Sequence, residues 1–162
     1  MLLPVLVNPH PLLRERAQEV DAATLERLKR EGFVENLVET MRVKDGVGIA
    51  AIQVGQLHRI IVVQEGTKTR VYINPVITGH SIRKETDTEG CLSVPGKFGL
   101  VRRPKTCTIR ALDLDGNPIV RKAKGLVARI YQHEVDHLNG ILFVDKAEHV
   151  MDYDPEQDTP NV

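Results

Sequence analysis

Hydrophobic residues recur at helical spacing in two segments of the chain. In the first, over residues 24–43, Gly32 is a weak point for a helix. The second covers residues 126–139, and Gly140 follows it at the position where a left-handed residue commonly ends a helix. The apolar positions of the first segment are Leu25, Leu28, Val34, Leu37, Val38 and Met41. The pattern therefore predicts one helix near each end of the chain.

Short β-type runs lie between the two predicted helices. They cover residues 58–65, 70–75 and 77–82. Residues 106–123 alternate between apolar and polar and contain Asp115-Gly116, a strong hairpin-turn signal. A helix, several antiparallel strands and a second helix predict an α+β fold.

The length, composition and charge of the chain limit the class of protein to which it can belong. The chain has 162 residues, of which 41% are hydrophobic and 27% charged, values that predict one globular domain over residues 1–162. Lys plus Arg equals Asp plus Glu at 22 each, so we expect neither nucleic acid nor a membrane surface as a partner. The tail after Asp145 is acidic and contains two prolines. We expect it to be loosely ordered, and flexible from about residue 150.

Cysteine usage and the first residues indicate the compartment. Cys91 and Cys107 could in principle form a disulfide, but two cysteines without a secretion signal fit a reducing compartment better. Residues 1–7 are apolar, yet they contain Pro4 and lack a basic flank. They predict an edge strand or an anchored terminus and not a signal peptide. No apolar run approaches the roughly 20 residues that span a bilayer, so we expect a cytoplasmic protein.

Residues 133–137 (HEVDH) are an instance of the motif H-E-x-x-H. On a helix, His133 and His137 lie on one face about 5–6 Å apart, so both imidazoles can reach one metal ion. Glu134 projects at a neighbouring angle, from which it can hydrogen-bond a water on that ion. Both histidines continue the buried apolar stripe of Leu126 and Ile130. Two histidines on a solvated helix face are the alternative, which the complete, inward-facing motif disfavours.

A third metal ligand is needed. The extended peptidase motif has Phe143 where its third histidine should stand, and the downstream acids Glu148 and Glu156 are poorly placed. Cys91 is the better candidate, because one thiolate and two imidazoles leave a fourth position open for water. Taken alone, Cys91 could be a small buried hydrophobe. A purely structural metal site would normally supply a fourth protein ligand, and Glu134 would have no purpose there.

The glycine-rich segment over residues 46–53 (GVGIAAIQ) contains G-x-G. It is a weak phosphate-binding signal, because no third glycine or lysine follows in register. The glycines more simply permit close backbone approach beside a ligand. Gln53 offers an amide donor for a developing oxyanion, although on its own a loop or surface role is the simpler interpretation.

For two charged residues near these motifs, the sequence leaves two possible roles open. Arg103 could pair with Glu89 and fix the strand that carries Cys91, or the two could form an exposed ion pair of little energetic worth. Asp136 could orient a histidine ligand, or it could be a surface charge on the helix.

The three segments GVGIAAIQ (46–53), EGCLS (89–93) and QHEVDH (132–137) resemble, in order and in spacing, the motifs of bacterial-type peptide deformylases. Weaker matches are INP (73–75), SVPG (93–96) and ARIYQHE (128–134), and the resemblance covers roughly residues 8–145. Each motif alone is unspecific, whereas the combination is highly specific.

The resemblance implies antiparallel sheets packed around a central metal-binding helix, with an N-terminal helix. It implies metal-dependent hydrolysis of the formyl group from the N-terminal formyl-Met of nascent polypeptides, with release of formate. The ion is then Fe²⁺, with Zn²⁺ or Ni²⁺ able to replace it. The residues that the resemblance assigns are the metal ligands Cys91, His133 and His137, the general base Glu134, the oxyanion donors Gln53 and Leu92 (through its N–H), and the substrate-binding residues Val47, Gly48, Leu126 and Ile130.

The chain departs from the family pattern in three places. Asp87 stands where an apolar residue is common, and Phe98 stands where some bacterial enzymes carry an arginine near the substrate. These departures bear on side-chain preference and not on the chemistry. Many bacterial members end in a basic helix that docks at the ribosomal exit, whereas this chain ends in an acidic tail. The tail argues against that docking mode, and any ribosome contact would be transient.

Two other functions stay open at this point. A metallopeptidase would use the same H-E-x-x-H motif, but the missing downstream ligand argues against it. A catalytically silent relative acting as a structural metal protein or binding module would not be expected to keep both Glu134 and Gln53.

Overall fold

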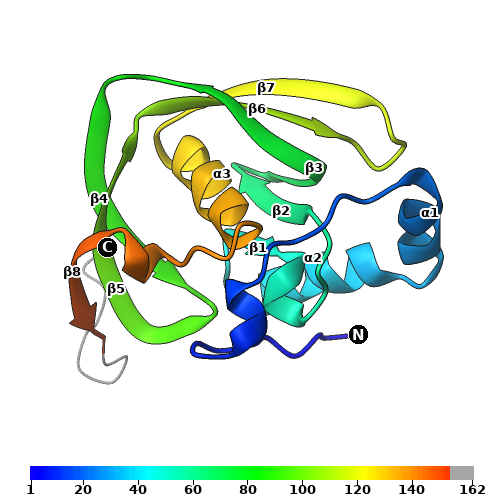
Figure 1. The fold of residues 1–162 in the computed structure, drawn as a ribbon, viewed down its shortest axis with the longest axis horizontal. Coiled ribbons are helices and arrows are strands. Elements are labelled where there is room, and N and C mark those ends of the chain that lie inside the picture. The colour runs from blue at the N-terminus through cyan, green and yellow to red at the C-terminus, as the bar shows by residue number, and fades with distance from the viewer. Residues whose placement is uncertain (154–162) are drawn as a thin grey trace.

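The computed structural model describes residues 1–153, and Figure 1 shows their arrangement. The helices are α1 (Ala22–Arg30), α2 (Phe33–Val43) and α3 (Gly125–His137), with short 3₁₀ turns η1 (Pro11–Arg14), η2 (Ala51–Val54) and η3 (Phe143–Asp145). The strands are β1 (Gly48–Ala50), β2 (Ile60–Glu65), β3 (Lys68–His80), β4 (Lys84–Cys91), β5 (Val94–Pro104), β6 (Thr106–Leu112), β7 (Pro118–Lys124) and β8 (Ala147–Asp152).

The strands form two antiparallel sheets, one ordered β1-β2-β3-β6-β7 and one ordered β4-β5-β8. Helix α3 lies in the middle of the molecule between them (Figure 1). The expected α+β fold around a central helix is confirmed.

Strand β2 is buried on both faces, which explains its unbroken run of apolar residues. Ile61 and Val63 belong to the core beneath α3, whereas Ile60 and Val62 belong to the core that α1 and α2 cover. The five-stranded sheet therefore separates two hydrophobic cores, and its α3 side carries the helix with the H-E-x-x-H motif.

The single helix predicted over residues 24–43 is wrong, because two helices occupy this segment. Gly32 has a φ of 68° and breaks the helix in the left-handed region. The side chain of Asp21 caps α1 by accepting a hydrogen bond from the Thr24 N–H at 2.8 Å. The weak point expected at Gly32 is thus a complete break.

The strands differ from the prediction mainly around Cys91. The predicted hairpin over residues 106–123 is confirmed as β6 and β7, and the two runs over residues 70–82 form the single strand β3, with register shifts. A strand was expected at EGCLS, which carries Cys91, but the hydrophobic pattern predicts neither the full length of β4 nor β5, because β4 is mostly exposed and polar and offers no apolar alternation.

Both ends of the described chain are tied to the body. Residues 1–7 form no strand but are anchored, since the Leu3 and Leu6 N–H groups donate to the Thr40 hydroxyl at 2.9 Å and the Gln53 carbonyl at 2.7 Å. The expectation of loose order after Asp145 is wrong for β8, which pairs with β5. The rest of the predicted acidic tail, residues 154–162, lies outside the described residues.

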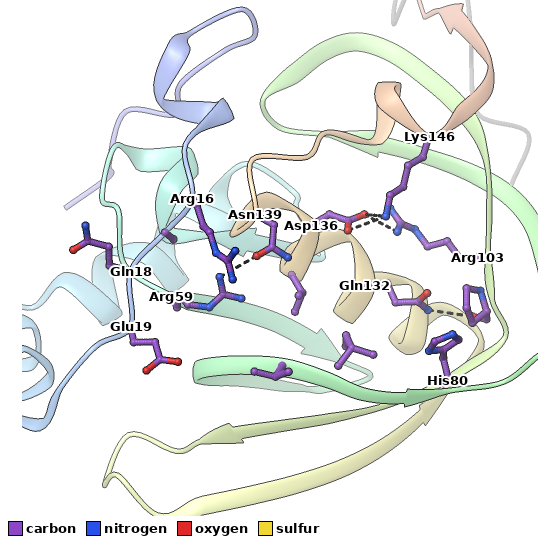
Figure 2. A pocket seen from close by; sticks show the side chains of 15 residues that line it. Arg16, Gln18, Glu19, Arg59, His80, Arg103, Gln132, Asp136, Asn139 and Lys146 are labelled. Atoms are coloured by element: carbon purple, nitrogen blue, oxygen red, sulfur yellow. Dashed lines mark hydrogen bonds and ion pairs between the residues drawn. The ribbon is translucent and has the colours of Figure 1, made fainter.

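The C-terminal end of α3 is held by a buried arginine. The Nη1 atom of Arg59 donates to the Leu138 carbonyl at 3.2 Å and to Asn139 Oδ1 at 3.0 Å, at the edge of a cavity drawn in Figure 2. The guanidinium satisfies a carbonyl that the helix end leaves free and complements the helix dipole. Among the described helices, none is long and apolar enough to cross a membrane.

Replacing Gly140 with alanine should destabilise the protein more than the same change at Gly116. Both glycines have a positive φ, 74° and 80°, which costs alanine about 1–2 kcal/mol. A Cβ at Gly140 would also collide with the Arg14 carbonyl, whereas none of the described atoms lies within 4 Å of a Cβ at Gly116. Urea unfolding should therefore give a free-energy loss about 1–3 kcal/mol larger for Gly140→Ala. Equal losses would contradict this account.

Candidate metal centre

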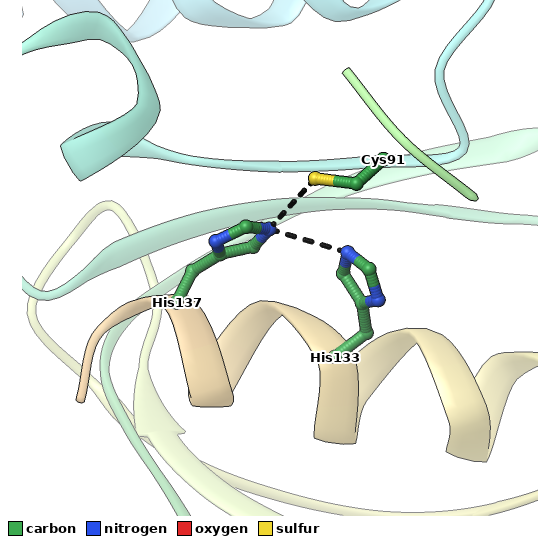
Figure 3. Close-up of side chains that lie close together, drawn as sticks. All are labelled: Cys91, His133 and His137. Carbon is green, nitrogen blue, oxygen red and sulfur yellow. Dashed lines mark hydrogen bonds between the residues drawn. The ribbon is translucent and has the colours of Figure 1, made fainter. Parts of the chain in front are cut away.

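Three predicted ligands converge between α3 and the end of β4 (Figure 3). His137 Nε2 lies 3.2 Å from His133 Nε2 and 3.2 Å from Cys91 Sγ. The three ligand atoms all lie within 4.8 Å of one another. Metal–nitrogen and metal–sulfur bonds of about 2.0 and 2.3 Å fit this separation, so one ion could contact all three atoms.

Hydrogen-bond donors surround the Cys91 sulfur. The Ser93 N–H approaches Sγ at 3.4 Å and Gln53 Nε2 approaches it at 3.5 Å. The register shift between Glu89 and Cys91 places the sulfur just before the turn into β5. These contacts hold the sulfur in place beside the two imidazoles. Cys91 and Cys107 are both free thiols, so the open possibility of a disulfide is wrong.

A buried ionic network fixes the orientation of His133. The Nδ1 atom of His133 lies 2.9 Å from Glu89 Oε2, which leaves Nε2 for the ion. Arg103 binds both Glu89 oxygens, at 2.5 and 2.9 Å, and Arg129 donates to Oε1 at 2.8 Å. Arg103 also donates to Asp136 at 2.8 Å. The exposed pair considered for Arg103 and Glu89 is therefore wrong, since only 3% and 5% of these residues are exposed.

The two histidines have opposite electrostatic environments. Burial lowers the pKa of His133, but its hydrogen bonds with Cys91 and Glu89 prevail and raise the pKa to about 10. Burial, followed by the charges of His133 and Arg103, lowers the pKa of His137 well below its usual range. Since a metal ion binds the unprotonated imidazole, an ion at this site would compete with the proton on His133.

Glu134 lies beside the ligands without a full set of partners. It is 4% exposed, and its Oε2 has no hydrogen-bond partner among the described residues. Burial raises its pKa to about 7, against the opposing charge of His133. A Cβ at Gly48 would collide with the Glu134 carboxylate, which explains why glycine is required there. A carboxyl group with a pKa near neutrality suits proton transfer.

Gln53 is a buried residue of η2 and not a surface residue. Its Oε1 accepts from the Ala50 N–H at 2.8 Å, and its Nε2 donates to Ser93 Oγ at 3.1 Å. These two contacts fix the amide so that its donor end faces the cysteine. The simpler interpretation of Gln53 as a loop or surface residue is therefore wrong.

A cavity of about 410 Å³ adjoins these residues. The predicted substrate-binding residues and Leu92 all line it, but 64% of Leu126 is exposed, so the apolar stripe of α3 is not buried at that end. Arg129, Gly96 and Tyr153 also line the cavity. Arg129 and Gly96 belong to the weak family matches ARIYQHE and SVPG, which assigned them no role. No periodicity or motif includes Tyr153, so no sequence signal pointed to it.

A larger cavity, about 830 Å³, lies on another face of α3 (Figure 2). Arg59, Gln132 and Asn139 line it, whereas none of the three candidate ligands does. The larger cavity therefore lacks the candidate ligands, whereas Cys91 and His133 line the smaller one.

Comparison with known proteins gives one consistent match. The family model described as "Polypeptide deformylase" matches residues 2–152. The chain is 45% identical over 150 residues to a peptide deformylase of Pelotomaculum thermopropionicum, covering 91% of this chain and 92% of that protein. It is 47% identical over 146 residues to one of Desulforudis audaxviator, with 88% and 92% covered. The crystal structure of peptide deformylase from Thermotoga maritima is similar with a TM-score of 0.86 and 36% identity, covering 92% of this chain and 99% of that one.

Replacing Glu89 with glutamine should weaken metal binding about 10- to 100-fold, because the amide no longer holds His133 by a charged hydrogen bond. Competition between the protein and a chelator for Zn²⁺ measures the change. Glu85→Gln is the matched control, since Glu85 lies on the same strand but is exposed. A Glu89→Gln protein that binds Zn²⁺ as tightly as the control would refute the orienting role.

Proposed function

The chain belongs to the peptide deformylase family, and we propose that it works through a metal ion held by Cys91, His133 and His137. The family's activity is removal of the formyl group from nascent peptides. The observation that carries the residue assignment is the convergence of three distant segments. Gln53, Cys91 and the helix with His133 meet at one cavity. Membership of this family also favours deformylation over peptide cleavage and over a silent binding module.

The donor set fits a single divalent ion. Three side-chain donors converge, His133 is oriented by Glu89, and a cavity opens beside them for substrate. When bound, such an ion would polarise the formyl carbonyl and activate a water molecule.

Glu134 is the proposed general base and acid. Its Oε2 would take a proton from the attacking water as the water oxygen bonds to the formyl carbon. The same carboxyl group would then give that proton to the amine nitrogen as the carbon–nitrogen bond breaks. Formate and a peptide with a free N-terminal amine leave. The buried position and near-neutral pKa of Glu134 support both steps.

Gln53 and Leu92 are the proposed oxyanion donors. Attack on the formyl carbon places negative charge on the carbonyl oxygen, which Gln53 Nε2 and the Leu92 N–H would stabilise. Donors already aimed before the reaction avoid reorganisation, and each is worth about 10²–10³ in rate. The Ala50 and Ser93 contacts that hold the Gln53 amide support this role.

The substrate would lie extended across the cavity. We assign the methionine side chain to the surface formed by Leu126 and Ile130 of α3, and the peptide backbone to the segment that contains Val47 and Gly48. Recognition of an extended backbone tolerates many sequences, as a processing enzyme for nascent chains requires.

We propose Fe²⁺ as the ion in the cell, with Zn²⁺ or Ni²⁺ able to replace it. One thiolate and two imidazoles suit all three ions, so the family resemblance and not the ligand set supports iron. A nascent-peptide substrate supports a cytoplasmic location and a transient contact with the ribosome.

Glu134→Gln should lower kcat for formate release from formyl-Met-Ala-Ser by at least about 10²–10⁴-fold while the protein keeps its metal. The amide is nearly the same size but cannot accept the proton of water. Formate assays and metal analysis of the same preparations measure both quantities. Glu148→Gln, an exposed acid, is the control. A Glu134→Gln enzyme with normal turnover would refute the mechanism.

Chelation followed by anaerobic addition of Fe²⁺ should abolish and then restore formate release. Metal analysis of protein purified anaerobically should find one iron per chain, because Cys91, His133 and His137 form one site. Protein that contains Zn²⁺ under these conditions, and gains nothing from Fe²⁺, would contradict iron as the ion in the cell without affecting the assignment of the ligands.

A further inference from the structure

The cavity beside the metal centre has a second wall that does not belong to α3. Phe98 of β5 and Tyr153, which directly follows β8, line it together with residues of the β4–β5 turn. Strands β5 and β8 are paired in the three-stranded sheet and not in the five-stranded sheet. This second wall therefore comes partly from the C-terminal end of the described chain.

Phe98 lies against the backbone next to a metal ligand. An ideal Cβ at Gly90 would be 2.8 Å from Phe98 Cε1 and 3.1 Å from Cδ1. The phenyl ring therefore packs directly on Gly90, the neighbour of Cys91 in the sequence. Only glycine at this position lets the ring approach so closely.

Tyr153 is held against Phe98 by the backbone and by its ring. The Tyr153 N–H donates to the Gly96 carbonyl at 2.8 Å, and the preceding residues Met151 and Asp152 pair with Phe98 and Lys97. The two aromatic rings meet edge to face, with centroids 5.0 Å apart and an interplanar angle of 89°. This is a favourable geometry for an aromatic pair. Phe98 and Tyr153 are only partly buried, and both line the cavity.

Both rings line the same cavity as the candidate ligands Cys91 and His133. Phe98 packs on the residue next to Cys91, and the centroid of the Tyr153 ring is 5.0 Å from that of Phe98. An extended chain advances about 3.3–3.6 Å per residue. If formyl-Met occupies the cavity beside the metal ligands, the side chain of the following residue comes within reach of Tyr153.

Charge at this end of the cavity is already neutralised. Lys97 lines the cavity, but its ammonium group donates to Asp152 Oδ1 at 2.5 Å. The surface offered to the second residue of the substrate is therefore mainly aromatic. Aromatic and large aliphatic side chains gain most from such a surface.

We propose that Phe98 and Tyr153 form an aromatic wall that selects substrates with a large apolar or aromatic residue after formyl-Met. The proposal rests on the proposed function, since it requires that a formylated peptide occupies this cavity. It makes the end of β8 part of the substrate site.

The test compares two formylated tripeptides, formyl-Met-Phe-Ser and formyl-Met-Gly-Ser, on variants of the full chain. Tyr153→Ala should lower kcat/KM for the Phe peptide about five- to tenfold, mainly through KM, and change that for the Gly peptide less than about twofold. Tyr153→Phe keeps the ring and should behave as wild type. Met151→Ala is the matched control, because Met151 is an exposed apolar residue of β8 outside the cavity. It should leave the ratio between the two peptides unchanged.

The experiment tests the aromatic wall and the proposed function by separate measurements. Formate release by wild type from the Gly peptide tests the function, whereas the ratio between the peptides tests the wall. If Tyr153→Ala lowers kcat/KM equally for both peptides, or for neither, the aromatic wall is overturned while deformylation stands. If wild type releases no formate, calorimetric titration of wild type and Tyr153→Ala with the Phe peptide still tests the aromatic wall. Tighter binding to wild type than to Tyr153→Ala would support the wall, and equal affinity would overturn it.

Discussion

The site depends on the hydrogen bond between the buried carboxylate of Glu89 and the imidazole of His133. The carboxylate holds His133 through Nδ1 and is itself held by Arg103 and Arg129, so it joins β4, β5 and α3 at one point. Burial alone raises the pKa of Glu89, but its hydrogen bonds with His133 and Arg103 prevail and keep the pKa below its usual range. The carboxylate therefore stays ionised, and the orientation of the metal-binding imidazole does not change with pH near neutrality. Removing any partner would leave an uncompensated buried charge.

Close approach of backbones is the second constraint. Gly48 lies against Glu134, and Gly90 lies against Phe98, with no room for a Cβ in either place without displacement. The first approach puts β1 beside Glu134, and the second puts an aromatic ring beside the segment that carries Cys91. The glycines of the motifs are therefore explained by space within the cavity and not by phosphate binding.

Sequence patterns predict what is local and miss what only tertiary packing decides. The spacing of His133 and His137 follows from helical periodicity, and the helix is where the pattern predicts it. No periodicity connects β4 with α3, so Cys91 could be predicted as the third ligand only from the chemistry of metal sites. The full length of the polar strand β4 and the burial of Arg103 could not be predicted, since a charged residue is buried only when distant partners meet it. The pairing of β8 with β5 brings Tyr153 to the cavity, and no sequence pattern predicts that pairing.

The same network determines how Glu134 can act. The positive charges of Arg103, Arg129 and Lys146 are paired with the negative charges of Glu89 and Asp136. Glu134 is left outside these pairs, and burial is the largest influence on its pKa. A metal ion held by the adjacent histidines would add positive charge and lower that pKa. Among the described residues, no side chain donates a hydrogen bond to Oε2 of Glu134. This oxygen is therefore the one that could take a proton from a water molecule at the site.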